Sequence, residues 1–282
     1  MHSPGPPLRT DKETDMVKAI VTGVAGRMGG RIVHMMAAAP GIELAGALER
    51  PGHPAVGKDV GEVVGLPATG VKVVDDLSQV LPQAQVVIEF THPETSLAHL
   101  REVAAAGKAM VLGTTGFSAP QIAEIQALAS RVHLVFAPNM SVGVNLMFKV
   151  VADIAKVLGD GYDVEIVEAH HRLKKDAPSG TAIKLGQVLA HALGRELEKT
   201  GVYARHGIIG ERTAQEIGIQ TVRAGDIVGE HTVLFGGMGE RLEVIHRAHS
   251  RDNFARGAVR AAEWIVTQPP GLYDMQDVLG LK

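Results

Sequence analysis

The stretch that decides the fold is Val17-Lys18-Ala19-Ile20-Val21-Thr22-Gly23-Val24-Ala25-Gly26-Arg27-Met28-Gly29. Its first six residues form a short apolar run typical of a buried strand, and the residues after it, through Ala38, are typical of a helix. Between them the glycines follow a Gly-x-x-Gly-x-x-Gly pattern. Glycine has no Cβ atom, so such a turn lets a pyrophosphate approach the backbone at a helix N-terminus. Strand, turn and helix together predict a dinucleotide-binding unit, although three glycines alone can also form an ordinary turn.

A second strand is expected over residues 42–48, and it ends at Glu49-Arg50. Glu49 lies 20 residues after Gly29, where an acid can hydrogen-bond the adenosine ribose of NAD. Arg50 beside it can hold the extra phosphate of NADP, so the pair is compatible with NADH or NADPH. Alternatively, Glu49 and Arg50 can simply be exposed residues at the end of the strand, without a role in binding. The residues predicted to hold adenosine and pyrophosphate are Gly23, Val24, Ala25, Gly26, Arg27, Met28, Glu49 and Arg50.

Strand-like and helical patterns then alternate along the first half of the chain. Strands are expected at 72–74, 85–90, 109–112 and 132–137, with helices at 93–106 and 118–130. This alternation predicts an α/β fold with a Rossmann-type, doubly wound parallel sheet. Ligands of such sheets lie at the carboxyl ends of the strands, where the loops 90–92, 113–116 and 137–140 fall. Each of these loops can also be a plain connection.

The second half has a different pattern. Ser141 can cap a helix over 142–158, and strand-like segments follow at 163–168, 217–222, 230–235 and 241–249. Consecutive strands with short connections predict an α+β domain with a mixed or antiparallel sheet. One face of that sheet needs a cover, which favours an oligomer. A final amphipathic helix, 253–266, contains Trp264 and is expected to pack on the first domain together with residues 272–279.

The predicted domains follow from these patterns. Residues 1–15 contain three prolines and no apolar stretch, and are expected to be a disordered tail. Residues 16–141 and 252–282 are expected to form a discontinuous dinucleotide-binding domain. Residues 142–251 are expected to form a domain for substrate binding and oligomerisation.

One segment of the second half concentrates reactive side chains. It runs Glu168-Ala169-His170-His171-Arg172-Leu173-Lys174-Lys175-Asp176-Ala177-Pro178-Ser179-Gly180-Thr181-Ala182. If the preceding strand continues, the two histidines face opposite sides of the sheet and cannot chelate one metal. A helix expected over 181–193 would leave free amides at its start, where an anion can bind. An acid, a cation and an anion cradle suit a small carboxylated substrate that accepts a proton, although histidines and lysines also occur in structural roles.

This segment resembles the signature of the 4-hydroxy-tetrahydrodipicolinate reductase (dihydrodipicolinate reductase) family, and the glycine turn, the Glu-Arg pair and the later loops occur in the same order. The resemblance implies reduction of a cyclic imine dicarboxylate by NADH or NADPH, in the diaminopimelate route of lysine biosynthesis. It implies His170 as proton donor, Lys174 as its assistant, and His171, Gly180 and Thr181 as substrate ligands. It implies a homotetramer. The residues implied to surround the nicotinamide are Gly113, Thr114, Thr115, Ala137, Pro138, Asn139 and Met140.

Two further parts of the second half carry polar residues that could approach a substrate. Residues 223–231 resemble another block of the same family, but we interpret them as a tight turn between strands rather than as part of the chemistry. Among His246, His249 and Arg251, only Arg251 is expected to assist at the substrate.

Composition excludes several classes of protein. The formal net charge of −3 gives no electrostatic reason to expect nucleic acid or an anionic membrane as a partner. The chain has no cysteine, which excludes disulfides and thiol catalysis and is compatible with the cytoplasmic location that we expect. No metal is expected. Two alternatives stay open: another nicotinamide enzyme, such as an amino-acid dehydrogenase, and a dinucleotide sensor without turnover.

Overall fold

The computed structural model describes residues 16–282, so the expected tail, 1–15, lies outside the described residues. The first of its two sheets has seven strands in the order β12-β6-β5-β4-β1-β2-β3, and every neighbouring pair is parallel. The strands are β1 (Val17–Thr22), β2 (Ile42–Leu48), β3 (Val73–Val74), β4 (Val86–Glu89), β5 (Ala109–Leu112), β6 (His133–Phe136) and β12 (Gly271–Tyr273). The strand order reverses at β1, between β4 and β2, which is where doubly wound sheets bind nucleotides.

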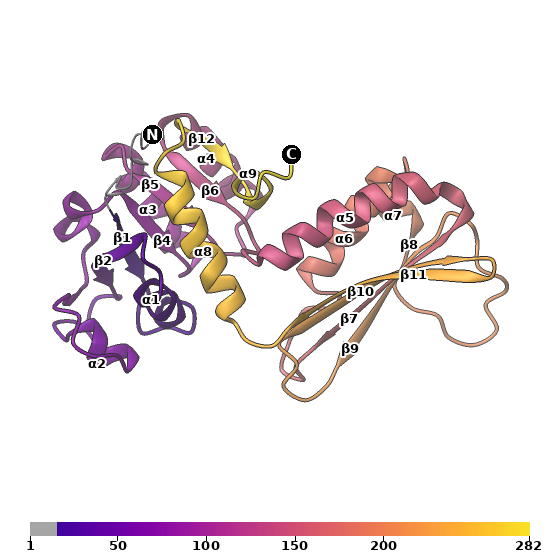
Figure 1. Ribbon diagram of the computed structural model, residues 1–282, viewed down its shortest axis with the longest axis horizontal. Coiled ribbons are helices and arrows are strands. Elements are labelled where there is room, and N and C mark those ends of the chain that lie inside the picture. The colour runs from indigo at the N-terminus through magenta and orange to yellow at the C-terminus, as the bar shows by residue number, and fades with distance from the viewer. Residues whose placement is uncertain (1–15) are drawn as a thin grey trace, which may run out of the picture.

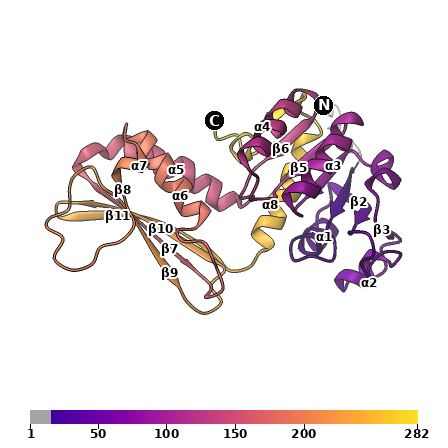
Figure 2. The same ribbon diagram turned by 180° about the vertical axis from the view of Figure 1, so that it is seen from behind.

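Successive residues of a strand point to opposite sides of the sheet. The apolar residues of these strands therefore lie on both faces, and helices cover both. Ala19 and Val21 of β1 join a core with α1 (Gly29–Ala37) and α8 (Asp252–Ile265), whereas Ile20 joins a core with α3 (Pro93–Ala105) and α4 (Ala119–Leu128). Figure 1 shows α8 running across one face, and Figure 2 shows α3 and α4 on the other. The short helices α2 (Val60–Val64) and α9 (Met275–Val278) lie at the periphery.

The second sheet has five strands in the order β11-β10-β7-β9-β8. It contains β7 (Asp163–His170), β8 (Gly201–Val202), β9 (Ile217–Arg223), β10 (Gly229–Gly237) and β11 (Glu240–Ala248). Pairs involving β10 are antiparallel, whereas β7/β9 and β8/β9 are parallel, so the sheet is mixed. The helices α5 (Val142–Leu158), α6 (Gly180–Ala192) and α7 (Leu197–Thr200) lie on one face, and α5 and α6 form a core with it.

The other face of the five-stranded sheet carries apolar side chains that are open to solvent. Val167, Val222 and Ile245 on three different strands are 39%, 43% and 45% exposed. Val167 and Ile245 both lie opposite Thr232 of β10, so they share one row across the sheet. In Figure 1 no helix of the described chain covers this face.

The structure confirms the predicted α/β class, with a parallel doubly wound sheet and a second, mixed sheet. It corrects some element limits: the helix expected over 118–130 ends at Leu128 and continues as a 3-10 turn, 129–131. The helix α8 and the strand β12 belong to the first sheet's layers, but the division into separate folding domains stays a prediction. None of the helices in residues 16–282 has the length and apolarity to cross a membrane.

Candidate active site

A cavity of about 840 Å³ lies where the loops after β5 and β6 approach the start of α6. The segment between β7 and α6 brings His170, Lys174 and Asp176 to its wall. At the carboxyl ends of β5, β6 and β12, the residues that line it are Thr115, Phe136, Ala137, Pro138, Asn139, Asp274, Met275 and Gln276. A bond from Asn139 Nδ2 to Thr181 Oγ1, 3.0 Å long, joins the two sides. The cavity therefore lies between the loops after β5 and β6 and the start of α6, which are far apart in the sequence.

The imidazole of His170 is positioned by its own strand. Glu168 and His170 are two residues apart on β7, so both point to the same, buried face. Glu168 Oε2 lies 2.5 Å from His170 Nδ1, and Glu168 is fully buried. When Nδ1–H donates to this carboxylate, Nε2 is the ring nitrogen left for chemistry in the cavity. A carboxylate–imidazole pair of this kind sets both the tautomer and the orientation of the ring.

Glu168 is ionised despite its burial. Burial raises the pKa of its carboxyl, but hydrogen bonds from Arg223, His170 and the Ser179 amide outweigh this and lower the pKa to about 2. Arg223 donates to both carboxylate oxygens, at 2.8 Å each, in the fork geometry that suits a guanidinium. The Ser179 amide contributes a further bond of 3.0 Å at the start of α6. One buried charge thus connects β7, β9 and α6 beneath the cavity.

The surroundings of His170 favour its neutral form. Burial lowers its pKa, and the charges of Lys174 and Arg223 lower it further, so that the opposing effect of Glu168 is outweighed. The ring of His231 meets it edge-to-face with centroids 5.2 Å apart, and Nε2 of His231 lies 3.2 Å from Ser179 Oγ. Burial is the main cause that lowers the pKa of His231, to about 3. The surroundings of His170 in the unliganded site therefore favour the neutral ring.

The cation and the anion cradle of the segment lie beside His170. Lys174 Nζ is 3.0 Å from Asp176 Oδ1, and both residues line the cavity. Ser179 caps α6 by accepting from the Ala182 amide at 3.2 Å. Among residues 16–282, no acceptor receives a hydrogen bond from the Gly180 and Thr181 amides at the start of the helix, and both residues line the cavity.

His171 lies differently from its neighbours. β7 ends at His170, so the strand alternation does not extend to His171. His171 is not among the residues that line the cavity, and its buried Nδ1 has no hydrogen-bond partner in the described chain. Its expected role as a substrate ligand stays a prediction.

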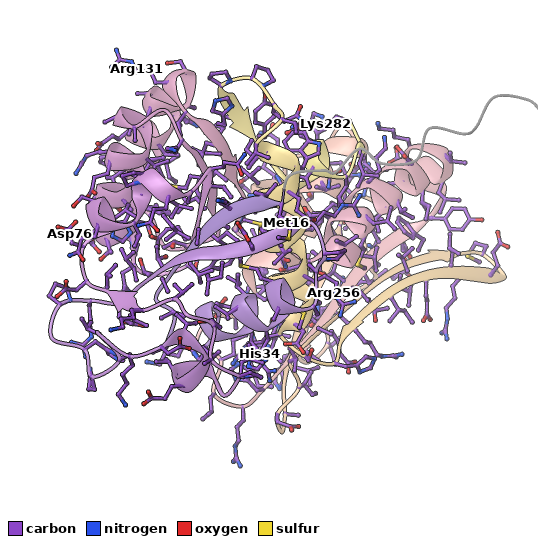
Figure 3. The ribbon with its side chains drawn as sticks, turned by 60° about the vertical axis from the view of Figure 1, so that its left-hand side comes forward. Met16, His34, Asp76, Arg131, Arg256 and Lys282 are labelled. Atoms are coloured by element: carbon purple, nitrogen blue, oxygen red, sulfur yellow. The ribbon has the colours of Figure 1, made fainter. Side chains whose placement is uncertain are left out.

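Two smaller hollows continue from the cavity toward the glycine turn. One, of about 270 Å³, shares Pro138 and Asn139 with the main cavity, and its wall includes Arg251. The other, of about 220 Å³, shares Arg27 with it and lies over the glycine turn, beside His34, which Figure 3 labels. The predicted cofactor residues that line these two hollows are Val24, Ala25, Gly26, Arg27, Met28, Gly113, Pro138, Asn139 and Met140. Shared lining residues therefore connect the three hollows, from the main cavity to the glycine turn.

The glycine turn and Glu49 are held together in a way that fits a dinucleotide. Gly23 has a φ of 59°, and its carbonyl accepts from the Gly26 amide at 2.8 Å, which makes the tight turn. Glu49 Oε1 accepts from the Ala25 amide at 3.0 Å, and Oε2 accepts from the Arg50 amide at 3.1 Å. The carboxylate is therefore fixed at the end of β2, next to the turn. Gly23, Glu49, Arg50 and Thr114 line none of the three hollows.

Sequence reasoning missed the residues that support His170. Glu168 was seen only as part of a motif, and the run 223–231 was interpreted as a turn. The turn is present, but Arg223 and His231 at its two ends contact Glu168, His170 and Ser179. The available signal was the spacing of Glu168 and His170, which puts an acid and an imidazole on one face of a strand. No cluster of three metal-ligating side chains occurs within residues 16–282.

Comparison with known proteins agrees across the chain. Residues 17–140 match the family described as "Dihydrodipicolinate reductase, N-terminus", and residues 143–279 match "Dihydrodipicolinate reductase, C-terminus". The 4-hydroxy-tetrahydrodipicolinate reductase of Syntrophobacter fumaroxidans is 61% identical over 267 residues, which cover 95% of this chain and 100% of the relative. The enzyme of the same name from Citrifermentans bemidjiense is 60% identical with the same coverage.

Solved structures agree with the fold. A dipicolinate-bound dihydrodipicolinate reductase from Paenisporosarcina sp. TG-14 has a TM-score of 0.72 at 27% identity, covering 92% of this chain and 97% of its own. An amine dehydrogenase from Mycobacterium smegmatis has a TM-score of 0.56 at 17% identity, covering 92% and 95%, which shows a shared fold alone. With both family matches and relatives at about 60% identity, the chain belongs to the dihydrodipicolinate reductase family.

Proposed function

We propose that this chain reduces 4-hydroxy-tetrahydrodipicolinate to tetrahydrodipicolinate in the diaminopimelate route of lysine biosynthesis. The observation that carries the proposal is the cavity in which His170, Lys174 and the free amides of α6 lie together. Its relatives at about 60% identity bear the name of this reductase over their full length. Family membership disfavours the alternative of an amino-acid dehydrogenase, and the sensor alternative becomes an outcome of the test below.

The substrate and product differ by one hydroxyl group, which hydrogen replaces. A hydride is delivered to the ring, and the departing hydroxyl leaves as water after taking up a proton. Reduced nicotinamide supplies the hydride when it is bound. The protein must therefore supply a proton donor at a site that also holds two carboxylates.

His170 is the proton donor in this proposal. Its ring favours the neutral form before substrate binds, so it must take up a proton when the substrate arrives. A substrate carboxylate close to the imidazole favours the charged ring, because opposite charges raise the pKa of a histidine. Arrival of the dianionic substrate would thus help to protonate the group that must then donate. Glu168 holds Nδ1, so that Nε2 makes the transfer.

The substrate carboxylates are assigned to the basic and amide groups around His170. Lys174 would leave Asp176 for a substrate carboxylate, and the Gly180 and Thr181 amides would hold the other at the start of α6. His171 is retained as a third candidate ligand. The relative from Paenisporosarcina is described with bound dipicolinate, which has the same dicarboxylate ring pattern.

NADH or NADPH would lie along the path of three hollows. The fixed carboxylate of Glu49 would accept hydrogen bonds from the adenosine ribose, and Arg50 and Arg27 supply positive charge for a phosphate. The glycine turn, Gly23 to Met28, would hold the pyrophosphate. The nicotinamide would lie against residues 113–115 and 137–140, next to the main cavity.

A homotetramer assembled through the five-stranded sheet is part of the same proposal. The exposed row with Val167 and Ile245, together with Val222, would be covered by another copy of the chain. Light scattering after size exclusion tests this, and Val167→Lys/Ile245→Lys should shift the mass toward smaller species. A wild-type chain that is monomeric at high concentration would contradict it. A cytoplasmic location is proposed with the pathway.

The direct test follows reduced-nicotinamide absorbance after mixing the protein with NADH or NADPH and freshly generated 4-hydroxy-tetrahydrodipicolinate. We expect oxidation that depends on the substrate, and the ratio of rates for the two cofactors reports what Glu49 and Arg50 select. Cofactor binding without oxidation would instead favour the sensor alternative.

His170→Gln tests the proton donor. General acid catalysis contributes about a hundredfold to ten-thousandfold, so kcat should fall by that order while the Kd for NADH stays within about twofold. Loss of cofactor binding in this variant would show that the role is wrong. His191→Gln, the same substitution at an exposed position of α6 that lines none of the three hollows, is the matched control.

A further inference from the structure

A second buried carboxylate lies in the first sheet, far from His170. Glu89 ends β4 at the point where the strand order reverses, and it is fully buried. Burial raises the pKa of its carboxyl, but the hydrogen bond and charge of His99 and the bonds from Thr91 outweigh this, so that the pKa lies below its ordinary value. A buried ion of this kind requires a complete set of partners.

The two oxygens of Glu89 have different partners. Oε2 lies 2.6 Å from His99 Nδ1 on α3. Oε1 accepts from the Thr91 amide at 2.8 Å, from the Thr91 hydroxyl, and from Ser96 Oγ at 3.1 Å. Ser96 Oγ in turn lies 2.8 Å from Thr114 Oγ1. The carboxylate is therefore linked to the loop after β4 directly and to the loop after β5 through one hydroxyl.

The loop after β4 also touches the loops on either side. A Cβ atom placed on Gly23 would lie 3.1 Å from Cγ2 of Thr91, so the threonine methyl group packs against the glycine turn. A Cβ placed on Gly113 would lie 2.1 Å from the ring of Phe90, so this ring packs directly against the loop after β5. The strands β1 and β5 flank β4 in the sheet, which brings all three loops to one edge.

We propose that Glu89 is a positioning residue for the cofactor: through Thr91, and through Ser96 to Thr114, it sets the spacing of the three loops that hold the dinucleotide. The inference rests on the proposed function, since it assigns those loops to NADH or NADPH. Glu89 does not line any of the three hollows and acts through its neighbours. A displacement of about 1 Å in such loops is enough to weaken a bound ligand strongly.

The test uses the Thr114 hydroxyl, which ends the chain of hydrogen bonds. Thr114→Val removes the hydroxyl at nearly constant volume, and Thr114→Ser keeps it. The Kd for NADH is measured by the fluorescence of the bound reduced cofactor, without substrate. We expect Thr114→Val to raise this Kd about tenfold and Thr114→Ser to leave it within about twofold, as the loss of one buried hydrogen bond predicts.

Ser96→Ala removes the hydroxyl that links Glu89 to Thr114. Ser96 itself lines none of the three hollows. It should raise the Kd for NADH by about the same factor, and the double variant with Thr114→Val should be no weaker than either single one, because both remove the same connection. The KM for the imine substrate should stay within about twofold.

Leu100→Val is the matched control for stability. Leu100 is fully buried on the same helix as Ser96 but belongs to its apolar core, so this variant lowers the melting temperature without touching the carboxylate. If Ser96→Ala changes the Kd for NADH no more than Leu100→Val does, the inference is overturned and the cluster only stabilises the fold. Wild-type protein that binds NADH but does not reduce the imine would refute the proposed reaction and leave this comparison valid. Wild-type protein that binds neither NADH nor NADPH would refute both.

Discussion

Replacing Glu168 by glutamine tests whether the buried charge under His170 holds the fold as well as the site. The ordinary pKa of 4.5 falls to about 2 in the native state, and the side chain is fully buried. One pH unit of such a difference corresponds to roughly 1.4 kcal/mol, so the ionised form stabilises the native state by roughly 3 kcal/mol at pH 7. Glutamine keeps the shape but not the charge that binds Arg223. We expect Glu168→Gln to lower the free energy of unfolding in urea by about that amount.

The pH dependence of this difference has a definite sign. The native pKa of Glu168 is depressed, so the stabilisation is complete above pH 4.5 and is lost as the pH falls toward about 2. The difference between wild type and Glu168→Gln should be constant from pH 6 to 8 and shrink to roughly 2 kcal/mol at pH 3.5. Glu62→Gln, which breaks an exposed pair with Lys58, should cost less than about 0.5 kcal/mol. A Glu168→Gln cost as small as that of the control would refute the charge assignment.

Three other predictions concern the second half of the chain. Because the native pKa of His231 is about 3, the unfolded chain takes up a proton below pH 6.5 that the native protein does not. His231 should therefore contribute about 2 kcal/mol to the loss of stability from pH 7 to pH 5, and the loss in His231→Gln, measured by the same urea titrations, should be smaller than in the wild type by that amount. Lys174→Met should lower kcat/KM for the imine about a hundredfold while the Kd for NADH stays unchanged. A change in kcat/KM of less than about twofold would contradict the role of Lys174 in the reaction. Ser141 caps α5 through the Val144 amide, so Ser141→Ala should cost about 1 kcal/mol in thermal or urea unfolding; an unchanged value would show that solvent replaces the cap.

Local pattern was sufficient for the main strands and long helices. The run 17–22 is apolar and followed by glycines, and α5 begins and ends at the residues expected from its apolar spacing and its Ser141 cap. Three of the shortest elements, β8, β12 and α2, were not foreseen, because their formation depends on a neighbouring strand or loop rather than on their own periodicity.

The site was predictable only where its residues are close in sequence. His170, Lys174 and the start of α6 lie within twelve residues of one another, and the structure places them around one cavity. Arg223 lies 55 residues after Glu168, and Thr114 lies 18 residues after Ser96, so that neither contact leaves a periodic signal. The partners of a buried ion come from whichever element packs against it, and the tertiary structure determines which element that is.

The position of α8 affects how the protein is made on the ribosome. Its alanines, together with Ile265, fill the same core as Ala19 and Val21, although synthesis separates them by more than two hundred residues. When residues 17–140 have left the exit tunnel, the face that α8 will cover is still without its cover and exposed to association with other chains. The nascent first sheet must wait until residues 252–265 are translated. Chains cut short before α8 should accumulate in aggregates or require chaperones, even though every residue of the glycine turn has already been made.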